Sequence, residues 1–465
     1  MLAPASVPRD NAGMIRSLLT ATAFLLVAPA AAQQAESPPE VSEARLRADV
    51  ERMVAFGTRH TLSDYDHPTR GIGAANRWAE AEFRLIGEGC GGCLTIQLPE
   101  EMVQGNRIPT PTRLVNVLAI QRGTERPDEV VIISAHIDSR VSDALDAVSD
   151  APGANDNASG SAAVLEAARV LSRQRFPTTI VYALLSGEEQ GLYGGRLLAR
   201  QAAAEGWTVK AVLNNDIVGG SRGSDGVTET EHVRVFSEAG RADATEAYRA
   251  SARREGGEND GPSRNLSRFI AGIAAQPGAP IGVRQVWRAD RFGRGGDQLP
   301  MQEAGFPAIR IAVAIEDYDH QHQDLRVENG VTYGDTVDEM DFAYLARATR
   351  LNISILTALA RAPMPPAVRV EGAVRPDTTV SWQPVAGAAG YSLYRRRTDE
   401  RDWTRLMERT PTSSASDGRI SVVLRGTRID DWVFGVSAIA ADGSESPIAS
   451  AVPGGAFQPL PRPAP

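Results

Sequence analysis

Five short segments of the sequence carry side chains that could bind metal ions and move a proton. The first is His136-Ile-Asp138, in which the histidine could bind zinc through one ring nitrogen while the carboxylate holds the other. The second is a glycine-flanked turn around Asp156, whose carboxylate could bridge two cations. The third is Glu188-Glu189, in which adjacent carboxylates repel each other unless a cation lies nearby. This pair could supply one general base and one metal ligand.

The fourth and fifth segments are Asn214-Asn-Asp216 and Asp319-His-Gln-His322. Each segment alone has an ordinary explanation, because Asn and Asp favour turns and helix N-termini and exposed Glu pairs are common. Turn and capping roles alone do not easily explain why several of these segments occur at equivalent places in the predicted fold. His136, the Glu pair, Asp216 and the late histidines each follow a predicted buried strand. Open α/β sheets build their sites at that end of their strands.

The predicted strands are short, apolar and rich in β-branched residues, as is typical of strands buried on both faces. They are expected at residues 129–134, 179–185, 209–213 and 309–313. Apolar residues at helical spacing predict helices at residues 41–56, 71–86, 161–172, 192–204 and 342–359. This alternation predicts an α/β fold, with a mostly parallel central sheet and helices on both faces.

Four motifs in this region together resemble those of peptidase family M28, the co-catalytic zinc metallopeptidases that include bacterial leucyl-type aminopeptidases. They are H-x-D at 136–138, G-x-N-D-N-A-S-G at 153–160, G-E-E-x-G-L-x-G at 187–194 and N-x-D at 214–216. The resemblance covers roughly residues 40–360, and the part from His136 to Asp216 is the most specific. It implies hydrolysis of N-terminal residues from peptides by metal-activated water.

The resemblance also assigns roles to individual residues. One zinc is bound by His136 and Asp216, and the other by Glu189 and a late histidine, with Asp156 bridging the two. Glu188 is then the general base, and Asp138 supports the first histidine. Two zinc ions per chain are therefore expected, with manganese or cobalt as alternatives. The family further implies a cis peptide bond between Asp156 and the residue after it.

The sequence departs from the family pattern at two places. The usual late motif is Tyr-His-Thr followed by Asp, whereas here Asp319-His-Gln-His-Gln-Asp324 offers both His320 and His322. His322 is favoured, because Gln323 and Asp324 then stand where residues usually follow the ligand. The second departure is Gly296-Asp-Gln298, where the family often has Ser-Asp-His. Because that segment helps to shape the substrate pocket, the family's specificity is not carried over.

The chain is expected to have four parts. Residues 1–32 resemble a signal peptide, with an apolar stretch at 18–28, a small-residue cleavage site and a true start that could be Met14. Residues 33–361 form the M28-like domain, and residues 362–366 have the composition of a linker. Residues 367–465 alternate in the manner of short strands and resemble a fibronectin type III β-sandwich, which could contact a cell surface or a partner.

These features predict an exported protein, periplasmic or secreted, without a membrane span. Export makes a disulfide between Cys90 and Cys93 reasonable. A redox motif is less favoured, because such motifs place the first thiol at the start of a helix, whereas this pair follows a predicted helix. A structural disulfide or a free pair remains.

Charge and motif content limit the alternatives. The formal charge is −9 with a pI near 5.4, so there is no excess of cations to bind nucleic acid. Peptides are the expected substrates. A carboxypeptidase, or another amide hydrolase on the same metal site, is the closest alternative. The M20 peptidases share H-x-D and Glu-Glu but lack N-D-N-A-S-G and carry a longer insertion. A binding protein acting through the C-terminal module is the non-enzymatic alternative.

Overall fold

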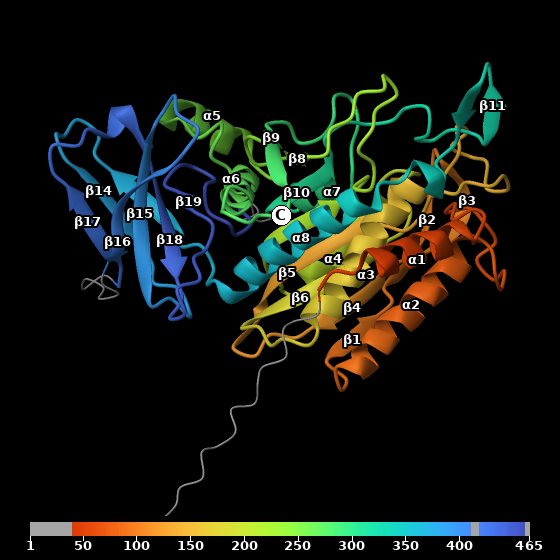
Figure 1. Cartoon of the computed structure of the whole chain (residues 1–465). Helices are drawn as coiled ribbons and strands as arrows, with labels where there is room; N and C mark the ends of the chain where they lie inside the picture. The colour runs from red at the N-terminus through yellow and green to blue at the C-terminus, as the bar shows by residue number, and fades with distance from the viewer. Residues whose placement is uncertain (1–39, 411–417, 461–465) are drawn as a thin grey trace, which may run out of the picture. The chain divides into compact units, whose positions relative to one another are not determined.

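The computed structural model describes residues 40–410 and 418–460, so the expected signal segment at 1–32 lies outside the described residues. An eight-stranded sheet lies at the centre of the M28-like region (Figure 1). Its strands, in spatial order, are β1 (Leu94–Gln97), β4 (Val117–Gln121), β6 (Thr178–Leu185), β5 (Arg126–His136), β7 (Thr208–Asn215), β10 (Ala308–Val313), β8 (His232–Phe236) and β9 (Gly282–Val286).

The sheet is mostly parallel, as the sequence predicts. The β6/β5, β5/β7, β7/β10 and β8/β9 pairs are parallel. The β1/β4, β4/β6 and β10/β8 pairs are antiparallel. Four neighbouring strands, β6-β5-β7-β10, therefore run in one direction, and their C-terminal ends meet at the same edge.

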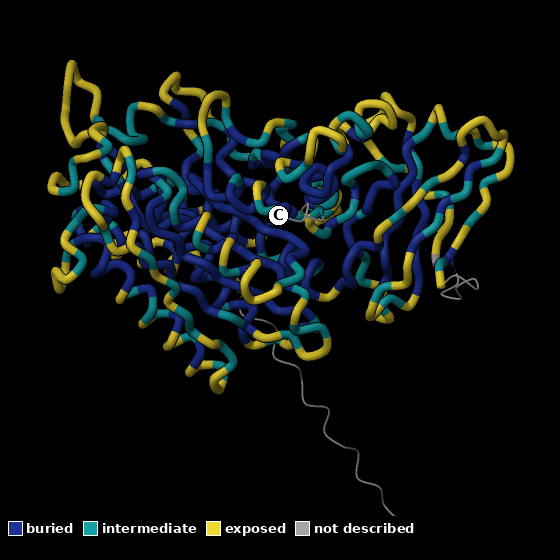
Figure 2. Tube along the Cα trace, turned by 180° about the vertical axis from the view of Figure 1, so that it is seen from behind, coloured by how far each residue is buried: buried dark blue, intermediate teal, exposed yellow. Residues whose placement is uncertain are grey.

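Helices cover both faces of the sheet, which confirms the predicted fold class. One face packs against α1 (Glu43–Val54), α2 (Gly71–Gly89), α3 (Gly160–Leu171), α6 (Pro262–Ala274) and α8 (Phe342–Arg361), and the other against α4 (Tyr193–Ala204) and α7 (Gln298–Glu303). Side chains of β5 alternate between the two cores: Val131 and Ile133 join the first, and Val130 and Ile132 the second. Figure 2 shows the resulting buried centre beneath exposed loops.

Smaller elements surround this sheet. They are the hairpin of β2 (Glu100–Gly105) and β3 (Ile108–Val115), helix α5 (Glu246–Glu255), the hairpin of β11 (Arg326–Glu328) and β12 (Val331–Tyr333), and the short 3-10 helix Val337–Glu339. None of the helices in the described part of the chain is long and apolar enough to cross a membrane.

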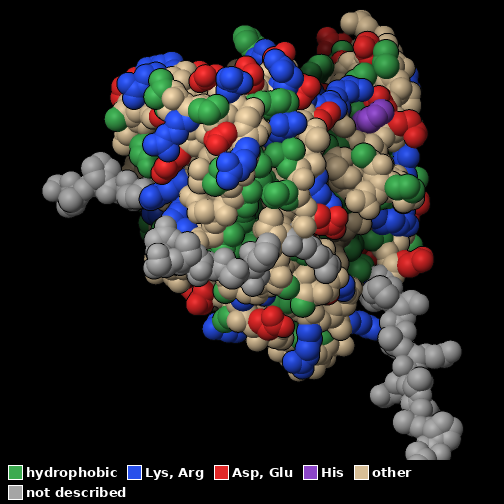
Figure 3. All heavy atoms as spheres, turned by 90° about the vertical axis from the view of Figure 1, so that its left-hand side faces the viewer, with side chains coloured by type: hydrophobic (Ala, Val, Ile, Leu, Met, Phe, Trp, Pro, Cys, Tyr) green, Lys and Arg blue, Asp and Glu red, His purple; other side chains and the backbone are tan. Residues whose placement is uncertain are grey.

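Two antiparallel sheets follow near the C-terminus. One contains β13 (Val368–Glu371), β14 (Thr378–Trp382) and β17 (Ile420–Leu424), and the other β16 (Thr404–Thr410), β15 (Gly390–Arg397), β18 (Trp432–Ile439) and β19 (Ala449–Ser450). They share a core in which Trp382 and Phe434 are buried. On the face of the molecule shown in Figure 3, basic and acidic side chains are interspersed rather than segregated by sign.

Buried polar contacts join the C-terminal sheets to the loop and helix that follow residue 259. Both oxygens of Asp260 accept hydrogen bonds from the Arg396 guanidinium, at 2.5 and 2.6 Å. The two side chains are 1% and 3% exposed, so this ion pair is removed from water. Nearby, the Asn265 amide donates to the Ser450 hydroxyl at 2.6 Å.

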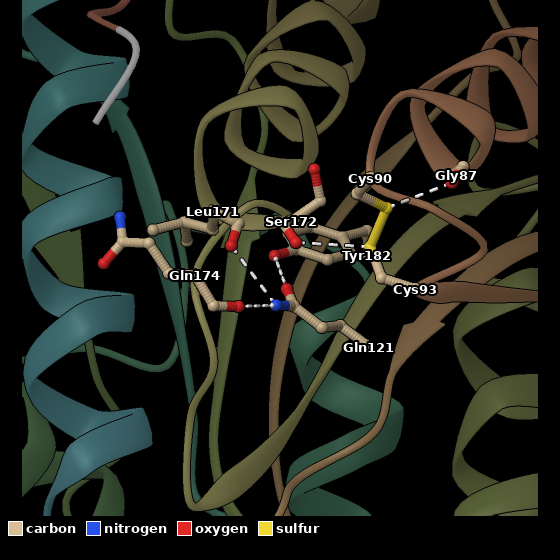
Figure 4. The surroundings of a disulfide bond; sticks show 8 residues. All are labelled: Gly87, Cys90, Cys93, Gln121, Leu171, Ser172, Gln174 and Tyr182. Carbon is tan, nitrogen blue, oxygen red and sulfur yellow. Dashed lines mark hydrogen bonds between the residues drawn. A yellow bond between two sulfur atoms is a disulfide. The ribbon is translucent and has the colours of Figure 1, made fainter. Parts of the chain in front are cut away.

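The two cysteines form a disulfide in the structure (Figure 4). Cys90 directly follows α2 and Cys93 directly precedes β1, so the bond joins the end of the helix to the start of the strand. The sulfur of Cys93 lies 3.2 Å from the Ser172 carbonyl oxygen, next to the end of α3. The position after a helix, rather than at its start, agrees with a structural disulfide.

Candidate metal centre

The predicted site residues meet at the edge where β6, β5, β7 and β10 end. His136 is the last residue of β5, Glu188 and Glu189 follow β6, and Asp216 directly follows β7. His322 lies in the loop after β10. Because these four strands are parallel neighbours, side chains that are distant in the sequence arrive at one place.

A first group of ligand-type atoms surrounds the His136 imidazole. Its Nε2 lies 3.2 Å from Asp156 Oδ1 and 3.6 Å from Asp216 Oδ1. All three side chains are buried. The three atoms are close enough to bind one ion together.

A second group surrounds His322. Its Nε2 lies 2.9 Å from Asp156 Oδ2 and 2.9 Å from Glu189 Oε1. Asp156 thus belongs to both groups and turns one carboxylate oxygen toward each. Two imidazoles and three carboxylates, largely shielded from water, form a donor set that suits a pair of zinc ions.

The structure separates the two late histidines. His320 lies elsewhere, with Nδ1 3.0 Å from Asp317 Oδ2 and Nε2 3.4 Å from Glu339 Oε1. His322, the favoured candidate, reaches Asp156 and Glu189 with a backbone φ of 55°. This left-handed conformation is uncommon for a residue other than glycine, and it turns the ring in a direction that residue spacing does not reveal.

Asp138 contacts more than the histidine it was predicted to support. Its carbonyl oxygen lies 3.1 Å from His136 Nδ1, and its Oδ1 lies 3.6 Å away. Its carboxylate also accepts hydrogen bonds from the backbone N–H groups of Glu188 and Glu189, at 3.3 and 3.2 Å. Asp138 therefore ties the end of β5 to the acidic pair after β6.

The turn that carries Asp156 is held from both sides. Asp335 accepts hydrogen bonds from the backbone N–H groups of Asn155 and Asp156, each at 2.7 Å. The Asn157 amide donates to the Asn215 carbonyl at 2.9 Å and so fastens the turn to the end of β7. The Asp156–Asn157 peptide bond is cis, as the family resemblance implies.

Gly160, the last residue of the G-x-N-D-N-A-S-G motif, allows two backbone segments to approach each other closely. A Cβ atom added at Gly160 would lie 2.4 Å from the Asn215 carbonyl oxygen. No side chain fits there, so α3 can begin directly against the end of β7. The glycine found in the motif is therefore also the residue that the packing requires.

The buried charges shift one another's pKa values. Burial disfavours the His136 imidazolium, but Asp138, Asp156 and Asp216 outweigh it and raise its pKa well above the usual value. Burial likewise opposes protonation of His322, yet Glu189 and Asp156 raise its pKa to about 10. Both rings therefore hold protons in the absence of a cation, and binding a cation must displace those protons.

A cavity of about 580 Å³ opens over the two groups and is lined by Glu188, Glu189, Asp156, Asp216 and His322 among others. Burial raises the pKa of Glu188 well above its usual value. Among the described residues, no hydrogen bond or ion pair is found for the Glu188 side chain. It can therefore turn toward a molecule in the cavity, whereas Glu189 is held by His322.

Comparison with known proteins identifies the family of this chain. Residues 116–340 match the model of peptidase family M28. A probable zinc metalloprotease of Leptosphaeria maculans is 39% identical over 436 residues, which cover 92% of this chain and 99% of that protein. Another, of Pyricularia oryzae, is 39% identical over 429 residues, covering 89% of this chain and 83% of that protein. The chain belongs to peptidase family M28.

A solved structure supports the fold of this M28 chain. LapB from Legionella pneumophila superposes with a TM-score of 0.50 at 18% identity, covering 68% of this chain and 71% of that protein. At this level of identity the likeness concerns the fold alone. The Leptosphaeria maculans relative aligns with 92% of this chain. The part left unaligned is shorter than the region of the C-terminal sheets, so the similarity extends into these sheets.

The second segment that departs from the family pattern, Gly296-Asp-Gln298, lies near the candidate metal ligands of this M28 chain. Burial is the main cause that raises the pKa of Asp297 to about 7. Asp297 accepts a hydrogen bond from the backbone N–H of Gly195 at 3.2 Å. Gln298, in place of the usual histidine, donates to Asp290 at 2.5 Å and accepts from the Asn214 amide at 3.2 Å. Gln298 is therefore part of a buried hydrogen-bond network.

Sequence reasoning missed several polar residues around the M28 site. Asp335, which holds the Asp156 turn, lies far along the chain with no motif of its own. Arg140 was also missed: its Nε lies 2.9 Å from Glu189 Oε2, and another of its nitrogens lies 2.6 Å from His322 Nδ1. Its position two residues after the H-x-D motif was the available signal. Residues 288–294 contain three arginines at a spacing of three, which was a second signal.

Proposed function

We propose that this M28 peptidase is an aminopeptidase that uses two zinc ions. The observation that carries the proposal is the bridging position of Asp156, with one oxygen toward His136 and Asp216 and the other toward Glu189 and His322. The names of the fungal relatives, probable zinc metalloproteases, support zinc as the metal. The first group would hold one ion and the second group the other.

Bound zinc would supply Lewis-acid chemistry, lowering the pKa of a water molecule and polarising the peptide carbonyl. The chain's own residues would do the rest. Glu188, which faces the cavity, would accept the water proton and pass it to the leaving amine. Asp138, through its bonds to the backbone of residues 188 and 189, would fix the distance between base and ligand.

Action at the N-terminus is supported by two features. The motifs between His136 and Asp216 resemble those of leucyl-type aminopeptidases. The cavity of about 580 Å³ lies in the size range of small-ligand sites, which suits one end of a peptide.

A matched set of substrates tests the proposal. Aminoacyl-p-nitroanilides with a free amine should be hydrolysed by the zinc-loaded protein, and a chelator should abolish the reaction. N-acetylated versions of the same substrates should not react, because an aminopeptidase requires the free amine. Hydrolysis of only the acetylated forms, or only of substrates with a free C-terminus, would instead favour an endopeptidase or a carboxypeptidase.

We also propose that the protein is exported, with a mature chain that begins near Gln33. The signal-like sequence at 1–32 motivates this, and the disulfide at Cys90 and Cys93 supports an oxidising compartment. The peptidase unit would span residues 33–361, followed by the linker 362–366 and a fibronectin-like module at 367–465 that contacts a surface or partner. N-terminal sequencing of protein recovered outside the cytoplasm tests export directly.

A further inference from the structure

The wall of the cavity above the two ligand groups is rich in arginine. Arg107, Arg140, Arg291 and Arg294 line it. The carboxylates among the lining residues all belong to the predicted metal site. The floor of the cavity is therefore acidic and suited to cations, while its wall is basic.

The four arginines reach the cavity from three separate segments. Arg107 lies in the turn between β2 and β3, and Arg140 follows β5. Arg291 and Arg294 lie in the loop between β9 and α7. Guanidinium groups repel one another, so their convergence on one cavity calls for a negative partner.

The carboxylates behind this wall are too few to neutralise it. Glu316, whose side chain is 3% exposed, is shared by Arg234, Arg291 and Arg294 at 2.5, 3.4 and 3.0 Å. One carboxylate cannot balance three guanidinium groups. Arg291 also lies 3.1 Å from Asp290 and 4.0 Å from Asp216. Both carboxylates are shared with a further buried arginine, and Asp216 is itself a predicted metal ligand.

The partner of Arg140 is itself a predicted metal ligand. Arg140 Nε lies 2.9 Å from Glu189 Oε2, while the other oxygen of Glu189 faces His322. When Glu189 binds a cation, its charge is shared with that cation. The metal-loaded cavity therefore keeps an excess of positive charge on its wall.

Two of the arginines keep hydrogen-bond donors for a ligand. The exposed Arg107 donates to the Glu189 carbonyl at 3.0 Å, and no other hydrogen bond of its side chain is found among the described residues. The side chain of Arg294 is 33% exposed. It donates to Glu316 and to Gln321 from the same nitrogen. Because a guanidinium has five N–H groups, several remain on each.

We infer that this arginine wall binds a carboxylate of the substrate, so that the enzyme prefers peptides with a negative group close to the scissile bond. The inference rests on the proposed function as a peptidase acting at this site. Two sources share the chemistry: an acidic side chain at the N-terminus, or the free C-terminal carboxylate of a dipeptide. Either could form paired charge-assisted hydrogen bonds with a guanidinium.

The same wall disfavours an apolar side chain such as leucine. Covering guanidinium groups with hydrocarbon removes their water without returning a hydrogen bond, which is unfavourable. Leu192 and Tyr318 are the larger apolar side chains that line the cavity. The leucyl preference of the family's bacterial members is therefore not expected here.

Two matched substrate pairs test the inference on the zinc-loaded full chain. Glu-p-nitroanilide is compared with Gln-p-nitroanilide, which has nearly the same shape without the charge. Ala-Ala is compared with Ala-Ala-amide, which lacks the C-terminal charge. The charged member of one pair should have a kcat/KM about tenfold higher or more, and the preference should shrink as ionic strength rises. The pair that responds identifies the source of the carboxylate.

Three variants identify the residues responsible. Arg107→Ala and Arg294→Gln should each reduce the preference by about tenfold. Arg294→Gln should fold, because Glu316 keeps Arg234 and Arg291 as partners. Arg288→Gln is the matched control: it lies exposed in the same segment, stacked on Phe292 rather than lining the cavity, and should leave the preference unchanged.

Efficient turnover with equal kcat/KM in both pairs would overturn the inference while leaving the aminopeptidase proposal intact. Failure to hydrolyse any of the substrates would reject the aminopeptidase proposal instead. Calorimetric titration with glutamate α-amide and glutamine α-amide then decides the inference without turnover. Tighter binding of the glutamate compound, lost in Arg294→Gln, supports the arginine wall, whereas equal affinities overturn it.

Discussion

The two carboxylates of the acidic pair should respond differently to the same chemical change. In Glu188→Gln, nearly the same shape is kept, but the side chain can no longer accept a proton. The Glu188 side chain has no hydrogen bond or ion pair among the described residues, so the replacement breaks no contact. We expect metal content to stay close to that of the wild type and thermal stability not to fall, while kcat falls.

The size of that fall follows from the role of a general base. Such a group typically contributes about two to four orders of magnitude in rate, which corresponds to about 3–5.5 kcal/mol in the activation barrier. In Glu189→Gln, by contrast, the structure predicts lost contacts. Glu189 lies 2.9 Å from His322 and 2.9 Å from Arg140, and it is buried. The replacement removes a ligand charge and leaves the Arg140 cation without its partner, so metal binding and stability should both decrease.

The assay combines three measurements on each variant: kcat on a free-amine nitroanilide, metal content after desalting, and the midpoint of thermal unfolding. Glu188→Gln should lower kcat without lowering metal content or the unfolding midpoint, whereas Glu189→Gln should lower all three. Near-normal turnover in Glu188→Gln would refute its assignment as the base. Loss of metal from Glu188→Gln, with retention in Glu189→Gln, would show that the roles are reversed.

Three further predictions concern His322 and His320, Arg396, and Glu238. His322→Ala should lose about one zinc per chain by elemental analysis, whereas His320→Ala should retain both; the opposite result would reverse their assignment. Arg396→Ala should lower the free energy of unfolding by about 2–3 kcal/mol in a denaturant titration, because the buried Asp260 carboxylate loses its two short hydrogen bonds and keeps, among the described residues, only Arg268, at 3.4 Å; a change below about 1 kcal/mol would contradict this. Burial is the main cause that raises the pKa of Glu238 from 4.5 to about 7, so the folded state binds its proton more tightly and stability falls as pH rises from 4.5 to 7. Glu238→Gln imitates the protonated form. It should therefore be more stable than the wild type at pH 8, by up to about 3 kcal/mol, and equally stable at pH 4. If the unfolding free energies of the two proteins change with pH in parallel, the effect is absent.

Much of the fold was predictable because its central strands are buried and rich in apolar, β-branched residues. The predicted strand at 179–185 corresponds to β6, and the predicted helix at 342–359 corresponds to α8. The strands missed by periodicity include β8 and β9, which lie at one side of the sheet and carry arginine within short sequences. The antiparallel pairing of β10 with β8 was equally hidden, since pairing between distant strands leaves no local signal.

The site was predictable in its residue types but not in its surroundings. Motifs indicated His136 and Asp216 because they stand at strand ends, and Asp156 because it lies in a glycine-flanked turn before a helix. The choice between His320 and His322 depends on a backbone conformation that spacing does not determine. The arginine wall went unnoticed because arginine is usual on protein surfaces, and only the fold shows which arginines face the cavity.

The spacing of the candidate metal ligands along the chain also affects when, during synthesis, the protein could begin to hydrolyse peptides. His136 and His322 are 186 residues apart in the sequence, and the Asp156 turn is held by Asp335, which is synthesised later still. A nascent chain that stops before these residues has the acidic pair and the first histidine but cannot complete the second ligand group. Proteolytic activity would therefore arise only after nearly the whole M28 region has been made and folded.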